Sequence, residues 1–269
     1  MVPLMDQQQL VGEVTSAVLG DADLRALFLA GSLGRGDGDR FSDVDLVAVV
    51  EREAQEGFGA RWRATFEAIT PVVFWHTPRG IKSLVSAITQ DWLRCDLFMV
   101  APDGLAGRAQ STLTPLIDPD DLHSALPDDL PPGASKPARV QGLIEEFIRV
   151  LGLLPVAIGR GEHVVATRGA GLLRDKLIDL MLEDAALPGG HGALHLSRLL
   201  PPEDMACLAA LPSARPDRPD VEAHLATARA FIPRARRMAR ELGLPWPEAF
   251  AAATARHLEA ELGVCLDLG

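Results

Sequence analysis

The first half of the chain alternates between helical and extended hydrophobic patterns. Apolar residues at helical spacing predict a helix over 7–19, with Asp6 placed to cap its start and Gly20 placed to end it. A short apolar run over 26–30 stops at a glycine, and a polar, glycine-rich stretch follows as far as Ser42. Further strands are predicted over 43–50, 71–76 and 92–100, with a helix around Trp62, Phe66 and Ile69. This alternation predicts an α/β (α+β) fold, with a mixed sheet and flanking helices.

The second half of the chain carries helical patterning. The segment Pro127-Asp-Asp-Leu-Pro-Pro-Gly133 is rich in residues that break regular structure, and it marks the predicted domain boundary. Beyond it, four segments repeat apolar residues at helical spacing. They are Val140, Leu143, Ile144, Phe147, Ile148 and Leu151; Leu173, Leu177, Leu180 and Met181; Val221, Leu225, Phe231, Ile232 and Met238; and Phe250, Leu258 and Leu262. We therefore expect an α/β domain over 1–126 and a C-terminal helical bundle over 136–269 that completes the substrate cleft.

Acidic charge is concentrated in the first half of the chain. The 269 residues include 26 Lys+Arg and 37 Asp+Glu, for a net charge of −11. Residues 1–134 hold 20 of the acidic residues against 10 basic ones. Binding to a nucleic-acid backbone needs a concentrated basic surface, so the charge argues against nucleic acid as a partner. It favours cationic or metal-bound partners instead.

Targeting signals and cysteines narrow the class of protein further. No stretch approaches the roughly 20 apolar residues that span a bilayer, and the N-terminus lacks the basic and apolar segments of a signal peptide. Cys95, Cys207 and Cys265 are odd in number and widely spaced, which argues against a disulfide framework or a cysteine-rich zinc site. These features predict a cytoplasmic protein without a membrane partner.

The residues with the clearest chemistry lie between positions 31 and 45. Asp43 and Asp45 are separated by one residue on a predicted strand, so their side chains share one face of the sheet. Neighbouring carboxylates repel each other, and Mg²⁺ prefers one or two carboxylates together with phosphate oxygens. Just upstream, Gly31 lets the backbone approach closely, and the local amides and the Ser32 hydroxyl are able to receive phosphate oxygens. Together these parts predict phosphoryl or nucleotidyl transfer.

Asp96 is the candidate for a third carboxylate. It stands in the middle of the apolar strand predicted over 92–100, and this strand is able to lie beside that of Asp43 and Asp45. The alternative is an ordinary acid on a strand, paired with Arg94.

The segment GSLGRGDGDRFSDVDL, residues 31–46, resembles the signature of the nucleotidyltransferase superfamily. That signature is a Gly-Ser pair followed by an acid-x-acid pair, with a third acid on a later strand. The form in this chain is most similar to that of antibiotic nucleotidyltransferases, which also join an α/β domain to a C-terminal helical bundle. They usually have alanine where this chain has Gly34, a difference that we expect to be neutral. The resemblance is specific over 26–50, fair at Asp96 and only architectural beyond residue 130.

The resemblance implies roles for individual residues. Asp43 and Asp45 would bind Mg²⁺ bridging the triphosphate of ATP or another nucleoside triphosphate, and Gly31 and Ser32 would hold the β and γ phosphates. Asp96 would either complete the metal site or act as the general base on the acceptor hydroxyl. Further candidates for contact with the nucleotide are Arg35, Ser42 and Lys176. For Arg35 and Lys176 the alternative is an ordinary surface side chain.

We therefore expect a Mg²⁺-dependent, adenylyltransferase-like enzyme. It would move a nucleoside monophosphate, AMP from ATP, to a hydroxyl of a small molecule and release pyrophosphate. An aminoglycoside or lincosamide antibiotic is one candidate acceptor, by resemblance, and a cationic acceptor suits the acidic first half. Two alternatives remain open: a nucleotidyltransferase that modifies a protein or RNA, and a catalytically silent regulator that binds nucleotide.

Overall fold

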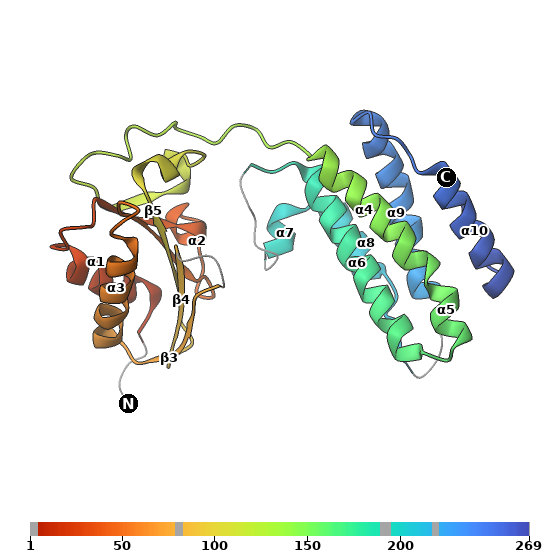
Figure 1. Cartoon of the computed structure of the whole chain (residues 1–269), viewed down its shortest axis with the longest axis horizontal. Helices are drawn as coiled ribbons and strands as arrows, with labels where there is room; N and C mark the ends of the chain where they lie inside the picture. The colour runs from red at the N-terminus through yellow and green to blue at the C-terminus, as the bar shows by residue number, and fades with distance from the viewer. Residues whose placement is uncertain (1–4, 79–82, 189–194, 217–220, 269) are drawn as a thin grey trace. The chain divides into compact units, whose positions relative to one another are not determined.

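The computed structural model describes residues 5–78, 83–188, 195–216 and 221–268 (Figure 1). The chain divides into two compact units, Met1–Leu130 and Pro131–Gly269. The expected architecture, a mixed sheet with flanking helices followed by a helical region, is confirmed.

The first unit is built on a six-stranded mixed sheet. Its described strands are β1 (Ala26–Ala30), β2 (Val44–Val49), β3 (Val72–His76), β4 (Leu84–Thr89), β5 (Arg94–Val100) and β6 (Thr114–Ile117). The helices between them are α1 (Gln7–Val18), α2 (Gly31–Gly34), α3 (Gln55–Ile69), and the short 3₁₀ turns η1 (Pro102–Leu105) and η2 (Gln110–Thr112). The strand order is β3-β4-β5-β2-β1-β6, in which β2 and β5 run parallel and the other described neighbours run antiparallel.

One face of the sheet is covered by α1 and α3 (Figure 1). Helix α1 begins with a capping box, in which the Asp6 carboxylate accepts the backbone N–H of Gln9 and the Gln9 side chain accepts that of Asp6. The expected cap at Asp6 is therefore confirmed. The core on this face includes Leu10, Val14 and Val18 of α1, Phe58, Trp62 and Phe66 of α3, and Val44, Leu46, Ala48, Cys95 and Leu97 of the sheet.

The opposite face of the sheet is covered over only part of its length. Val47 and Val49 of β2 pack there with Ala26, Phe28, Leu105 and Leu113, and with the partly buried Phe98 and Val100 of β5. These contacts use the C-terminal ends of β2 and β5. The N-terminal ends of the two parallel strands, on the same face, carry charged residues instead.

Two strands and three short helical turns of the first unit, β4, β6, α2, η1 and η2, have no counterpart in the sequence prediction. Strand β4 contains Ser86 among apolar residues, and β6 is four residues long and contains Pro115, so neither shows a strong periodic pattern. The glycine-rich stretch after β1 starts with the single turn α2. The predicted strand at 26–30 is confirmed with both of its ends. Those at 43–50, 71–76 and 92–100 are confirmed with one or both ends shifted by one or two residues.

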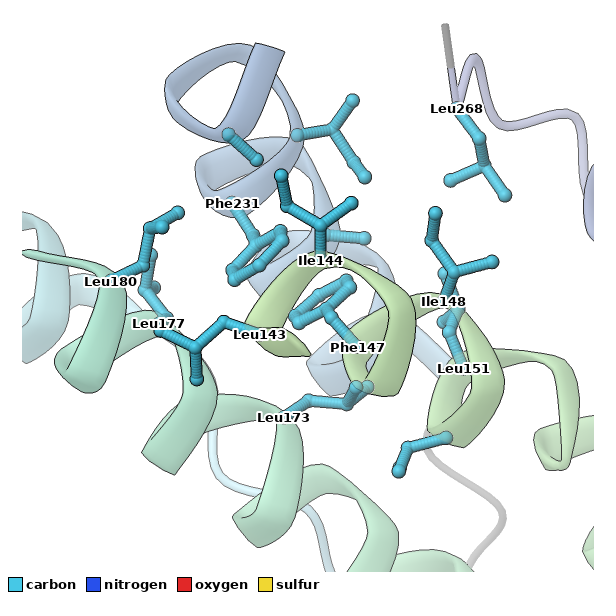
Figure 2. Close-up of a cluster of buried hydrophobic side chains, with 14 of the residues drawn as sticks. Leu143, Ile144, Phe147, Ile148, Leu151, Leu173, Leu177, Leu180, Phe231 and Leu268 are labelled. Atoms are coloured by element: carbon cyan, nitrogen blue, oxygen red, sulfur yellow. The ribbon is translucent and has the colours of Figure 1, made fainter. Parts of the chain in front are cut away.

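In the described residues of the second unit, the regular structure is helical. Its described helices are α4 (Pro137–Gly152), α5 (Leu154–Gly159), α6 (His163–Ala185), α7 (Leu196–Leu199), α8 (Pro202–Ala210), α9 (Val221–Glu241) and α10 (Glu248–Leu262). The four predicted helices correspond to α4, α6, α9 and α10, and they share one core. At its centre the rings of Phe147 and Phe231 stack with centroids 3.8 Å apart, among leucines and isoleucines of α4 and α6 (Figure 2).

Candidate active site

Three carboxylates meet at the N-terminal ends of β2 and β5. The two strands are parallel and in register, so Asp45 is paired directly with Asp96, and Asp43 immediately precedes β2. The expectation that the strand of Asp96 lies beside that of Asp45 is thereby confirmed. One carboxylate oxygen from each of Asp43, Asp45 and Asp96 lies within 4.8 Å of the others, and all three residues are half-buried. We refer to these three residues as the acid cluster.

Repulsion within the acid cluster shows most clearly at Asp45. Burial raises the pKa of its carboxyl group, and the charges of Asp43 and Asp96 raise it further, to about 6. The positive charges of Arg94 and Arg35 offset part of this effect. The three carboxylates offer hard oxygen ligands on one face at a separation that could hold a metal ion, and a cation there would relieve the repulsion.

Arg94 belongs to the site, although its place in the sequence suggests only an ion pair with Asp96. It lies two residues before Asp96 on β5 and therefore points to the same face of the sheet. Its Nη2 lies 3.2 Å from Oδ2 of Asp43, on the neighbouring strand. The spacing of two residues between Arg94 and Asp96 predicts this placement, because side chains two apart on a strand share one face of the sheet.

The turn from β1 into α2 closes directly onto Asp45. Gly31 has φ +61°, in the left-handed region, and a Cβ atom at this position would lie 1.9 Å from Oδ2 of Asp45. Only glycine fits such an approach. Helix α2 begins at Gly31, and the first N–H groups of a helix have no partner within it, so this turn presents backbone donors at its start.

The loop that follows α2 is held in place by Ser42 and by a residue of α1. The Ser32 hydroxyl donates to Oγ of Ser42, at 2.9 Å, and the same Oγ accepts the backbone N–H of Asp39, also at 2.9 Å. Nε2 of Gln7 donates to the carbonyl oxygens of Arg40, at 2.9 Å, and of Ser42, at 3.1 Å. Ser42 is buried and orients Ser32. Gln7 gives no signal in the sequence, because it lies 32 residues or more from its hydrogen-bond partners in the loop.

The two basic candidates lie in different units of the chain. Arg35 caps the C-terminus of α2, pairs with Asp37 at 3.4 Å and leaves 44% of its side chain exposed. The positive charge of Arg35 offsets part of the rise in the pKa of Asp45, so Arg35 interacts electrostatically with the acid cluster. Lys176 lies on α6 of the second unit, where Arg149 foremost and then Lys176 lower the pKa of Glu146. A contact of Arg35, Ser42 or Lys176 with nucleotide stays a prediction.

Gly34 lies against β1, and this backbone leaves no room for a side chain there. A Cβ atom at Gly34 would lie 2.3 Å from the carbonyl oxygen of Leu29. The hydroxyl of Thr114, on β6, donates to the carbonyl oxygen of Gly34 at 2.8 Å and holds the turn close to the sheet. An alanine here therefore requires the turn to move away from β1.

Comparisons with known proteins find similarity among solved structures. No family model matches the chain, and no curated protein does. Among solved structures, an aminoglycoside 6-adenyltransferase from Bacillus subtilis aligns over 94% of this chain and 98% of its own, with 13% identity and a TM-score of 0.44. At that TM-score the likeness carries no argument about function. Within the described ranges, none of the helices has the length and apolar character needed to cross a membrane.

Proposed function

We propose that this protein is a Mg²⁺-dependent nucleotidyltransferase. It transfers AMP from ATP to a hydroxyl of a small molecule and releases pyrophosphate. The observation that carries this proposal is the placement of the acid cluster directly against the glycine turn at Gly31. A cluster of acidic residues alone does not indicate a function. Here a backbone turn lies against the cluster, so N–H donors able to bind phosphate stand next to carboxylates able to bind a metal.

The chain divides the binding of a nucleoside triphosphate between two neighbouring groups of residues. Asp43 and Asp45 would hold the metal, and their half-buried carboxylates offer the oxygen ligands it needs. Bound Mg²⁺ supplies positive charge that neutralises the phosphates and the departing pyrophosphate. The backbone N–H groups at the start of α2 bind the β and γ phosphates. The Ser32 hydroxyl, which donates to Ser42 in this structure, turns its one proton to a phosphate oxygen, and its oxygen then accepts the proton of Ser42.

Asp96 is assigned to the incoming hydroxyl. In the transfer, the acceptor oxygen forms a bond to the α-phosphorus, the bond from that phosphorus to the bridging oxygen breaks, and pyrophosphate leaves. The acceptor proton moves to the carboxylate of Asp96. Asp96 suits this task because β5 lies on the side of β2 opposite to β1, away from the turn that holds the leaving phosphates.

The acceptor in this proposal is a small cationic molecule, an aminoglycoside or a lincosamide. The net charge of −11 and the acidic first half of the chain attract such cations. With such an acceptor the protein would act in the cytoplasm and confer antibiotic resistance.

Pyrophosphate release tests the proposal directly. Purified protein is given Mg-ATP and a panel of aminoglycosides and lincosamides, beside Asp45→Asn and the control Asp91→Asn, which makes the same chemical change at an exposed turn. We expect release that depends on one acceptor. It should persist in the control and fall by about a hundredfold or more in Asp45→Asn, because a group that stabilises transferred charge is lost.

Thermal stabilisation by Mg-ATP separates the ways in which the panel could be silent. Folded protein that shows neither stabilisation nor release contradicts the nucleotidyltransferase proposal. Stabilisation without release contradicts the antibiotic acceptor alone, and it directs the search to protein, RNA or a regulatory role.

A further inference from the structure

The row of polar residues at the acid cluster continues across two more strands. Asp45 is paired with Asp96, Asp96 with Ser86 of β4, and Ser86 with His76 of β3. Residues paired across neighbouring strands point to the same face of a sheet. Ser86 and His76 therefore extend the acid cluster to the edge of the sheet, on the face that α1 and α3 do not cover.

An exposed aromatic pair stands at the end of this row. Phe74 is two residues before His76 on β3, and their rings stack with centroids 6.2 Å apart and planes 9° apart. Phe74 is 52% exposed, and His76 is exposed as well. Trp75 between them points to the other face, where its ring meets that of Phe66 at 5.8 Å. The core of the sheet thus uses Trp75 and leaves Phe74 and His76 to solvent.

The order of the strands places this aromatic pair on the entry side of the proposed reaction. The turn at Gly31 follows β1, on one side of β2 and β5, while β4 and β3 lie on the other side. With the β and γ phosphates at Gly31, pyrophosphate leaves toward β1. An in-line displacement brings the entering oxygen from the opposite direction, and that direction is over β4 and β3.

We propose that Phe74, His76 and Ser86 form the acceptor-binding surface of the transferase, an inference that rests on the proposed function. The two rings bind the flat C–H or aromatic face of a ring in the acceptor, and Ser86 hydrogen-bonds its polar edge while a hydroxyl reaches Asp96. Neighbouring strands are about 4.8 Å apart, so the path from Asp96 to His76 is about 10 Å. The acceptor is therefore a molecule of at least two rings, with the reacting hydroxyl on one and the stacked face on the other.

Kinetics with the acceptor found by pyrophosphate release tests this surface. Phe74→Ala and His76→Ala are compared with Val73→Ala, a change at a neighbouring residue of β3 that is 62% exposed. We expect the KM for acceptor to rise about tenfold in the two ring variants, which is the size of a lost stacking contact, and to stay unchanged in the control. The KM for Mg-ATP should stay unchanged in all three. An unchanged KM for acceptor in both ring variants overturns the assignment.

A binding measurement gives an answer without turnover. The imidazole proton signal of His76, assigned with His76→Gln, is followed by NMR while neamine, a two-ring amino sugar, is added in the presence of Mg²⁺ and α,β-methylene-ATP. A shift in the wild type and in Val73→Ala that is lost in Phe74→Ala supports the surface. No shift at millimolar neamine, in protein that the nucleotide analogue stabilises, overturns it. We expect the analogue to stabilise every variant except Asp45→Asn. A wild-type protein that the analogue does not stabilise would count against the proposed function rather than against this surface.

Discussion

Replacing Asp45 by asparagine is predicted to stabilise the metal-free protein while removing its response to Mg²⁺. Burial and the charges of Asp43 and Asp96 raise the pKa of Asp45 from 3.8 to about 6. The folded protein therefore holds this proton more tightly than the unfolded chain does. The resulting contribution to the free energy of unfolding is fully present below about pH 4 and is lost as the pH rises through about 6.

The magnitude follows from the size of the pKa shift. Each pKa unit corresponds to about 1.4 kcal/mol, so a rise from 3.8 to about 6 would cost the ionised, metal-free fold about 3 kcal/mol. Because the side chain is only partly buried, we discount this to about 1–2 kcal/mol for solvent screening. Asparagine keeps the shape of the side chain without its charge. For a unit of this size we expect a rise in Tm of about 3–8 °C at pH 8, falling to about half of that at pH 5.

Thermal melts followed by tryptophan fluorescence in EDTA measure this difference. Trp62, Trp75 and Trp92 lie in the first unit and only Trp246 in the second, so the signal reports chiefly on the unit that holds Asp45. Asp91→Asn is the control, and it should melt like the wild type. Added Mg²⁺ should raise the Tm of the wild type and leave that of Asp45→Asn unchanged. An Asp45→Asn protein that melts at or below the wild-type Tm at pH 8, or whose advantage is the same at pH 5, refutes the reasoning.

Three further changes probe the turn, the loop and the second core. Gly31→Ala should abolish stabilisation by Mg-ATP, because the added Cβ atom meets Oδ2 of Asp45. The control is Gly36→Ala, at φ +78° and with no atom near the added Cβ. It should lower the free energy of unfolding by only about 1 kcal/mol and leave the stabilisation by Mg-ATP intact. Gln7→Ala removes the hydrogen bonds to the loop, so we expect Mg-ATP to bind several-fold more weakly by calorimetry, and equal affinity would contradict this role. Phe147→Ala should destabilise the second unit by about 3–5 kcal/mol in a denaturant titration monitored at Trp246, with the first unit's transition unmoved.

Features that depend on neighbouring residues in the chain could be predicted from the sequence alone. A strand repeats every two residues, so Asp43 and Asp45 had to share a face wherever their strand lay. The cap at Asp6 and the main helices of the second unit are likewise local, because each depends on residues within a few turns of one another. The mixed fold class followed from the alternation of helical and extended patterns within the first half of the chain.

Tertiary structure decided which segments meet. Strand β5 could have joined the sheet at several places, and only its parallel pairing with β2 puts Asp96 opposite Asp45 and Arg94 within 3.2 Å of Asp43. The same pairing order brings Ser86 and His76 into the row, from strands whose own sequences give little sign of a site. Such contacts join residues far apart in the chain, and they arise because both faces of the sheet must bury their apolar side chains at once. Local pattern supplied the chemistry of the site, and the packing of the sheet assembled it.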